Sequence, residues 1–220
     1  MKKLVIFGNG EFASIANYYF SDRVVEFFCA DDELCKENSF EKKPLIPKSE
    51  LLKKNKSDFE LFVSISYRNM NELRTTKYLE LKKHGFNFTS FIHEKSYISK
   101  ASTIGENCLI LEGQNIQKDV EIQNNVFLWS GNHIGHNSII KNNSYISSHV
   151  VISGNCEIGE NCFFGVNSSV KDNIKIGNKC MIGMGSNVTT NLKEGSVVAS
   201  EKSRVYKPED KISKIIKDKI

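Results

Sequence analysis

A large apolar residue recurs at every sixth position through the middle of the chain, and this repeat limits the fold more than any other feature. In steps of six from Ile98 to Val188, all sixteen positions hold Ile, Leu, Phe or Val. An α-helix turns about 100° per residue, so this period would scatter the side chains around its axis. A sandwich would need hairpin turns and period-two alternation. The pattern therefore predicts a parallel β-helix of stacked hexapeptide repeats.

Small or β-branched residues occupy the position four residues after most of these apolar residues, which predicts a second inward position in each repeat. Four of the six cysteines, 108, 156, 162 and 180, fall there. No CxxC pair occurs, so we expect reduced thiols. Glycine follows the inward residue at 105, 135, 159, 165, 177 and 183, which we interpret as corners that need a permissive backbone.

The first 92 residues instead alternate short apolar runs with helix-like segments, which predicts a small parallel α/β sheet. The expected strands are 3–8, 24–32, 59–65 and 86–92, and the expected helices are 11–20 and 70–83. Pro44 and Pro47 lie in a lysine-rich stretch that we expect to be a loop followed by a short helix. The predicted domains are 1–95, α/β and half-Rossmann-like; 96–195, the β-helix; and 196–220, a tail with a short helix.

That last helix is expected within 208–220, because Ile212, Ile215, Ile216 and Ile220 fall on one helical face that could pack on the coil or on a neighbour. The net charge of +4 comes from 30 basic and 26 acidic residues without a block of five like charges, which argues against a nucleic-acid partner. Neither a long apolar run nor a leader cleavage site is found, so we expect a cytoplasmic protein without a membrane partner.

A GxGxxA motif, GNGEFA at 8–13, lies between the first expected strand and helix. Gly8, Asn9, Gly10 and Glu11 would let a ligand approach the backbone at a helix N-terminus, where phosphate is favoured. Asp31 and Asp32, at the end of the next strand, could accept sugar hydroxyls. Three interpretations remain open: a tight turn without ligand, a mononucleotide or nucleotide-sugar site, and a nicotinamide site.

Three histidines, His133, His136 and His149, lie within 17 residues in the middle of the repeats, and none falls on an inward position. They could be solvated or inter-subunit polar residues. Two histidines three residues apart could supply zinc ligands, but no cysteine or acid completes a recognisable set. A general base fits best, because imidazole has an ordinary pKa near neutrality.

With a GxGxxA-type α/β domain before an uninterrupted hexapeptide coil, the chain resembles the bacterial acetyl-CoA-dependent N-acetyltransferases of nucleotide-linked amino sugars. These belong to the sialic acid O-acetyltransferase-like family, and the most specific stretch is 125–170. The resemblance implies a left-handed β-helix, a homotrimer, acetyl-CoA as co-substrate without a metal, and a nucleotide sugar held by the first domain.

The resemblance also implies roles for individual residues. His136 falls on the catalytic histidine and Gly154 on the amide that binds the acetyl carbonyl, while Tyr145 replaces a second histidine that contacts acetyl-CoA. Asn137 replaces a residue that is often acidic in relatives, and His149 is a further candidate for the catalytic role. The remaining expected contacts are Gly165, Val166 and Gly183 for acetyl-CoA, and Arg68 for the nucleotide sugar.

The expected function is N-acetylation of a dTDP- or UDP-linked 4-amino-4,6-dideoxy sugar for bacterial surface polysaccharide (O-antigen or lipopolysaccharide), with His136 as general base. The alternatives are O-acetylation of a sugar hydroxyl and a non-catalytic β-helix scaffold.

Overall fold

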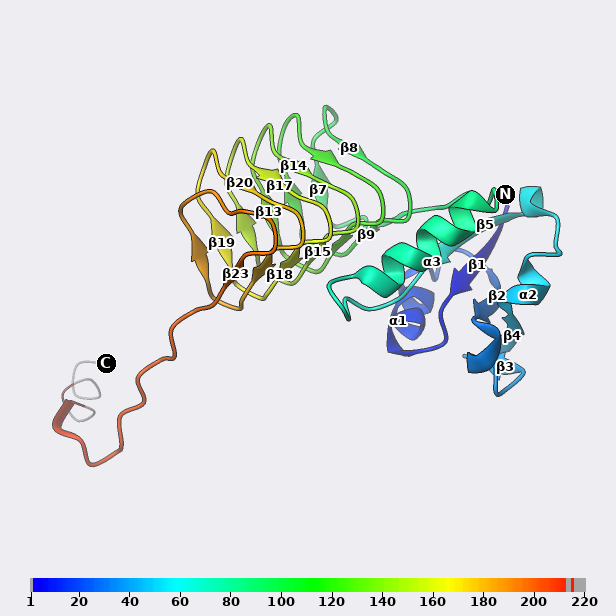
Figure 1. The fold of residues 1–220 in the computed structure, drawn as a ribbon, viewed down its shortest axis with the longest axis horizontal. Helices are drawn as coiled ribbons and strands as arrows, with labels where there is room; N and C mark the ends of the chain where they lie inside the picture. The colour runs from blue at the N-terminus through cyan, green and yellow to red at the C-terminus, as the bar shows by residue number, and fades with distance from the viewer. Residues whose placement is uncertain (1, 213–214, 216–220) are drawn as a thin grey trace.

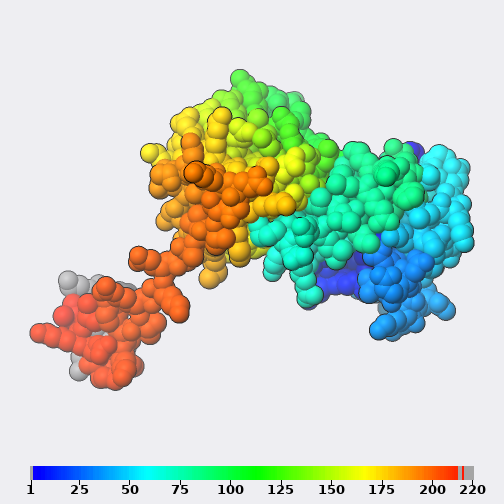
Figure 2. Space-filling view, in the orientation of Figure 1, coloured from blue at the N-terminus to red at the C-terminus, as the bar shows by residue number. Residues whose placement is uncertain are grey.

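The computed structural model describes residues 2–212 and 215 of the 220-residue chain. An α/β domain at the N-terminus leads into a stack of triangular coils, and a tail leaves the last coil (Figure 1). The same division is visible in the space-filling view, where the orange tail stands apart from the body (Figure 2). The fold class predicted from the sequence is confirmed: a mostly parallel α/β sheet followed by a left-handed parallel β-helix.

The sheet of the α/β domain has the order β3-β4-β2-β1-β5. Its parallel strands are β1 (Lys3–Phe7), β2 (Val25–Ala30), β4 (Lys43–Pro47) and β5 (Phe59–Val63), and β3 (Ser39–Phe40) runs antiparallel to β4. The helices are α1 (Glu11–Tyr19), α2 (Lys48–Leu51), α3 (Glu72–Lys83) and the short 3-10 helices η1 (Asp32–Leu34) and η2 (Lys56–Asp58). Alternate residues of β1 enter different cores, Leu4 and Ile6 on the side of α1, Val5 and Phe7 on the side of α3.

The expected loop around the two prolines is wrong, because residues 43–47 form β4, which pairs in parallel with β2. Pro44 and Pro47 lie near the two ends of this strand, and its other neighbour is only the two-residue β3. Proline is tolerated at strand ends and on sheet edges, where a missing N–H costs little. The short helix expected after this stretch is confirmed as α2.

The coils present three parallel sheets. The docked face, which carries the α/β domain, comprises β6 (Phe91–Ile92), β9 (Leu109–Ile110), β12 (Phe127–Leu128), β15 (Tyr145–Ile146), β18 (Phe163–Phe164), β21 (Met181–Ile182) and β23 (Val197–Val198). The second face comprises β7 (Tyr97–Ile98), β10 (Asn115–Ile116), β13 (His133–Ile134), β16 (Val151–Ile152), β19 (Ser169–Val170) and β22 (Asn187–Val188). The third face comprises β8 (Thr103–Ile104), β11 (Glu121–Ile122), β14 (Ile139–Ile140), β17 (Glu157–Ile158) and β20 (Lys175–Ile176).

Three corners join these faces, and each is named here by its position. The side corner leads from the docked to the second face (as at 129–132 and 147–150), the far corner from the second to the third (135–138, 153–156), and the anchor corner from the third to the docked face (105–108, 123–126). The far corner is therefore the vertex opposite the docked face. Residues 18 apart occupy equivalent places in successive coils, as the pairing of His133 with Val151 illustrates.

The six-residue repeat fills the inside of the coil as predicted. From Ile110 to Val188 every sixth residue is buried, and Ile98 and Ile104 pack on the same core from its first coils. Cysteines 108, 156, 162 and 180 are buried there as free thiols. The coil begins earlier than expected, because Phe91 and Ile92 already form β6; of the expected strand 86–92, Phe88 makes only an isolated bridge to Leu61 of the α/β sheet.

Asparagine rather than glycine supplies most of the permissive corner backbone. Residues with φ near +60° recur three places after the inward residue, as at Asn107, Asn125, Asn137, Asn155 and His149. The six glycines that follow the inward residue do not have such φ values, so our interpretation of them is wrong. At five of them a Cβ would collide with the next coil, as at position 135, where it would lie 2.5 Å from a backbone nitrogen; at Gly183 the nearest atom would be 3.0 Å away.

The α/β domain packs tightly on the docked face. Phe127 and Tyr145 are buried beneath it, and the Phe62 and Phe127 rings stack with centroids 5.8 Å apart. Arg74 of α3 is fully buried, lies 4.3 Å above the Phe127 ring and donates to the Asn143 carbonyl at 2.8 Å. Its burial lowers the pKa of the guanidinium to about 9. The two domains therefore form a continuous core.

The tail from residue 199 to 212 extends away from the coil (Figure 1), so it does not pack on the coil of its own chain. Residues 211 and 212 are helical. The rest of the short helix expected within 208–220 falls largely on 213–214 and 216–220, including Ile216 and Ile220, which lie outside the described residues.

Candidate functional site

A cavity of about 640 Å³ opens at the GxGxxA turn. Its lining comes from the turn after β1, the end of β2 and the loop between β5 and α3: Phe7, Gly8, Asn9, Gly10, Glu11, Phe12, Ala30, Asp31, Leu34, Ser64, Ile65, Ser66, Tyr67, Arg68 and Leu73. Six of the seven residues predicted to bind the nucleotide sugar line this cavity, and Asp32 is the exception. Ligands commonly bind at this position, outside the carboxyl ends of parallel strands.

The two glycines of the turn have different roles. Gly8 is buried with φ +142°, and a Cβ there would lie 2.6 Å from the Ser64 carbonyl oxygen, so the fold itself requires this glycine. Gly10 precedes α1 in an extended conformation with φ −120°, and a Cβ there meets no atom within 4 Å. A larger side chain at position 10 would therefore enter open space in the cavity rather than strain the fold.

Asp31 and Asp32 also differ. The Oδ1 atom of Asp31 accepts from Lys77 Nζ at 2.7 Å and pairs with Lys48 Nζ at 3.0 Å. Burial alone would raise the pKa of Asp31, but these two ammonium groups outweigh it and lower the pKa. Asp32 Oδ1 instead accepts from the Ser49 backbone N–H at the start of α2. Asp31 therefore remains a candidate ligand at the cavity, whereas Asp32 has a structural role.

Lys48 and Lys77 belong to this site through Asp31, although no sequence motif marks them. Both also pair with Glu80, at 2.7 Å for Lys48 and 3.7 Å for Lys77, so the carboxylate of Asp31 is held from two elements, α2 and α3. Lys48 begins the short helix α2, and no local pattern connects it with Asp31.

His136 lies exposed on the far corner. Its imidazole rests over Gly154 of the next coil, where an added Cβ would lie 2.7 Å from Nε2. The backbone N–H of His136 donates to Gln117 Oε1 at 3.0 Å. The absence of a side chain at position 154 thus provides the space that the ring occupies.

The amide of Asn137 contacts the other ring nitrogen. Its Nδ2 lies 3.3 Å from His136 Nδ1 and donates to Asn155 Oδ1 at 3.1 Å. The Gly154 N–H is not free, because it donates to Asp172 Oδ1 at 2.9 Å. The predicted contact of this amide with an acetyl carbonyl would therefore require the Asp172 side chain to rotate away.

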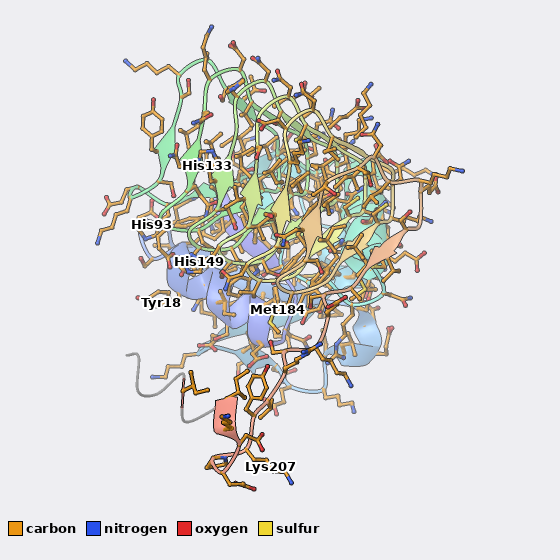
Figure 3. The ribbon with its side chains drawn as sticks, turned by 90° about the vertical axis from the view of Figure 1, so that its left-hand side faces the viewer. Tyr18, His93, His133, His149, Met184 and Lys207 are labelled. Carbon is orange, nitrogen blue, oxygen red and sulfur yellow. The ribbon has the colours of Figure 1, made fainter. Side chains whose placement is uncertain are left out.

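The structure does not bring the three histidines together. His149 belongs to the side corner, where its ring lies over Gly131, with Cε1 and Nδ1 both 2.7 Å from the position of an added Cβ. His133 lies on β13 in the second face, between the two corners. Figure 3 shows His149 on the side of the coil next to α1 and His133 farther from that helix. His136 is therefore the only one of the three on the far corner.

The residues predicted to bind acetyl-CoA are similarly dispersed. Gly154 is on the far corner, whereas Gly165, Val166 and Gly183 follow β18 and β21 on the side corner. Tyr145 is buried on the docked face among aromatic rings, with its centroid 5.6 Å from that of Phe163. The α/β domain covers Tyr145, and its contact with acetyl-CoA stays a prediction. The other residues can line one groove only if two chains supply them.

Gln117, Asn155 and Asp172, the neighbours of His136, were also missed. The 18-residue length of a coil could have found two of them, because residues 18 apart stack on each other: Asn155 stacks on Asn137, and Asp172 stacks on Gly154. Among residues 2–212 and 215, no group of three metal-ligating side chains is found. Within that same part of the chain, no helix has the length and hydrophobicity of a membrane span.

Comparison with solved structures identifies the same two-domain fold in other proteins. The acetyltransferase domain of PglB from Neisseria gonorrhoeae is 19% identical, with a TM-score of 0.80 over 91% of this chain and 97% of that chain. PerB from Caulobacter crescentus, solved with CoA and GDP-perosamine, is 21% identical, with a TM-score of 0.79 over 90% and 93%. WeeI from Acinetobacter baumannii is 16% identical, with a TM-score of 0.52 over 94% and 100%.

The fold that the sequence resemblance implied is thus confirmed. A comparison with curated protein sequences found no match. Residues 87–198, which is 112 of 220 residues, match the family described as the GMPPB C-terminal domain. Because this match covers more than half of the chain, including the coils that carry His136, the chain belongs to the GMPPB C-terminal domain family.

Proposed function

We propose that the chain is an acetyl-CoA-dependent N-acetyltransferase that acts on a nucleoside-diphosphate-linked amino sugar. The observation that carries this proposal is the exposed imidazole of His136, held over Gly154 on the outside of a rigid coil. Structures with the same fold bear the names of acetyltransferases, one of them solved with CoA and GDP-perosamine and another with acetyl coenzyme A. Those names support an acyl transfer and a nucleotide sugar as acceptor.

His136 would act as the general base in a direct transfer. The sugar amine attacks the thioester carbonyl carbon of acetyl-CoA, and Nε2 takes a proton from the attacking nitrogen. The tetrahedral intermediate then expels the CoA thiolate, which receives that proton from the imidazolium. The products are an acetamido sugar and CoA, and no covalent enzyme intermediate is needed. The Gly154 N–H would stabilise the oxyanion once Asp172 has moved, a contribution of about 2.7–4 kcal/mol in comparable sites.

The cavity of the α/β domain would hold the nucleotide sugar. The first-turn N–H groups of α1 and the open backbone at Gly10 suit a diphosphate, and the Arg68 guanidinium lines the same cavity. The Oδ2 atom of Asp31 can accept a ribose or sugar hydroxyl, because Lys77 and Lys48 pair with Oδ1. The identity of the base is left to experiment, since the cavity offers contacts to the shared phosphate and sugar.

The active site would be shared between chains. The cavity belongs to the domain on the docked face, whereas His136 lies on the opposite vertex of the coil. A substrate bound in the cavity would therefore meet the imidazole of a neighbouring chain. We propose a homotrimer, the assembly that the sequence resemblance implies, because in a closed ring of identical contacts every cavity receives one neighbouring His136.

Two measurements test this function. Incubation with acetyl-CoA and GDP-, UDP- or dTDP-linked amino sugars should release CoA with at least one of them and not with the matching hydroxyl sugar. Release with the hydroxyl sugar instead would indicate an O-acetyltransferase, and release with none would favour a scaffold.

Calorimetry then separates the two ligands. Gly10→Leu, which fills the cavity without strain, should abolish binding of the nucleotide sugar and leave acetyl-CoA binding unchanged. Asp32→Ala is the matched control, because Asp32 lies outside the cavity and should keep nucleotide-sugar binding. Unchanged nucleotide-sugar binding in Gly10→Leu would contradict the proposed site.

A further inference from the structure

The amide of Asn137 faces His136 with its nitrogen. The same nitrogen is shared between His136 Nδ1 at 3.3 Å and Asn155 Oδ1 at 3.1 Å. Asn137 and Asn155 are equivalent corner residues of successive coils, with φ near +57° in both. The two amides therefore form a short ladder that ends on the imidazole.

A second ladder, at the anchor corner, has the same direction. Asn107 Nδ2 donates to Asn125 Oδ1 at 2.7 Å, and Asn125 Nδ2 donates to Asn143 Oδ1 at 2.9 Å. A backbone group fixes this direction, because Asn107 Oδ1 accepts from the Val63 N–H at 2.7 Å. Within residues 2–212 and 215, no hydrogen bond holds Asn137 Oδ1 or Asn155 Nδ2 of the far-corner ladder, so that ladder is free to reverse.

The direction of the ladder decides the tautomer of His136. A neutral imidazole has one N–H donor and one acceptor nitrogen. When the amide nitrogen of Asn137 faces Nδ1, Nδ1 must accept and the ring proton resides on Nε2, the atom that lies over Gly154. Nε2 cannot then take a proton from a substrate. The basic tautomer requires Oδ1 of Asn137 to face an Nδ1–H.

Reversal of Asn137 involves Asn155 as well. Rotation of the Asn137 amide places Oδ1 where the shared nitrogen was, opposite Asn155 Oδ1. Two carbonyl oxygens cannot share a hydrogen bond, so Asn155 must rotate with it and present Nδ2. We propose that Asn155 is a positioning residue that acts through Asn137 to set which ring nitrogen of His136 carries the proton. This inference rests on the proposed function, in which His136 is the base.

Two substitutions of Asn155 with opposite consequences test the proposal. Asn155→Asp leaves only acceptors, so it holds the Asn137 nitrogen in place and should increase the Nε2–H tautomer. Asn155→Ala removes the acceptor and should shift the population toward Nδ1–H. Asn155→Asp should therefore lower kcat by about fivefold and Asn155→Ala should raise it by about fivefold, the usual effect of one hydrogen bond, with KM unchanged in both. Asn173→Ala is the matched control, at the equivalent place one coil further, where the side chain is exposed.

The tautomer is measured by the ¹⁵N chemical shifts of the histidine rings, with the His136 signals assigned by their loss in His136→Gln. The measurement needs no substrate, so it is independent of the proposed function. Equal tautomer populations in Asn155→Asp, Asn155→Ala and the wild type would overturn the role of Asn155. Full activity of His136→Gln would instead overturn the proposed base while leaving the tautomer result intact.

Discussion

The far corner shows how one missing side chain makes room for an imidazole on a regular coil. Along the anchor corner, a backbone N–H is accepted by a side chain one coil further, as between Glu106 and Asn124 at 3.0 Å. The same rule pairs the Gly154 N–H with Asp172. Glycine at 154 breaks the rule for His136, whose N–H turns to Gln117 and whose ring takes the vacant space. His136 is thereby left with an exposed ring and is a candidate base.

His136→Gln should lower kcat by about 10²–10⁴-fold, the usual effect of removing a general base. The fold should survive, because the side chain is exposed and outside the coil core. Steady-state kinetics with an unchanged circular dichroism spectrum would check this. His149→Gln is the control: it lies on the side corner, and we expect its catalytic activity to remain within a few-fold of wild type. The opposite result for the two variants would move the base to His149.

Asp31 should make the stability of the α/β domain depend on pH. Its pKa is lowered in the folded state by Lys77 and Lys48 despite burial, so the carboxylate stabilises the fold above the ordinary carboxyl pKa of about 3.9. That stabilisation is lost as the pH falls through the lower, folded pKa. Asp31→Asn should cost about 1.5 kcal/mol at pH 7, the low end for charged hydrogen bonds because Glu80 still pairs with both lysines.

Urea unfolding of both proteins at pH 7 and at pH values below 3.9 provides the check. The difference in unfolding free energy should shrink as the pH falls. A difference that stays constant over this range would show that the ion pairs contribute nothing.

At the scale of elements, structure that depends on a repeated residue type was predictable from the sequence, and structure that depends on partners distant in the chain was not. The apolar period predicted the buried residues at every sixth position from Ile110 to Val188, because burial inside a narrow coil leaves no other use for those side chains. Strand β4 was missed because prolines usually end strands, and these two are acceptable because they lie near the strand ends, next to the short β3. The corner glycines were misinterpreted because glycine is required there by the close approach of the next coil, and a linear sequence pattern does not show that approach.

The hydrogen bonds of the asparagine ladder at the anchor corner should stabilise the fold, in addition to the tolerance of asparagine for a positive φ. Asn107 is buried and accepts from Val63 of β5 while donating to Asn125, so it joins the α/β sheet to the coil. Asn107→Ala should therefore lose about 1–3 kcal/mol for unpaired buried groups, beyond the strain of alanine at φ +55°. Asn173→Ala, at φ +62° and exposed, has the strain alone.

Thermal or urea unfolding of both variants gives the difference directly. Equal losses in the two variants would mean that the ladder adds nothing to the strain of the left-handed corner.

At the scale of the whole molecule, the candidate site is divided. The cavity and the far corner with His136 lie on opposite sides of the coil, and the buried contacts of Arg74, Phe127 and Asn107 keep the α/β domain from swinging across. The sequence predicted both halves, because each has a local motif. Their separation was not predictable from the motifs, since it depends on which face of the coil the first domain covers.

Complementation between two inactive variants tests this division most directly. His136→Gln removes the base and Gly10→Leu fills the cavity, so each variant alone should be inactive. If each site combines the cavity of one chain with His136 of the next, oligomers formed from equal amounts of both should recover about a quarter of the wild-type activity, because one site in four receives both intact parts. Activity in the mixture that stays at the level of the separate variants would contradict a site shared between chains.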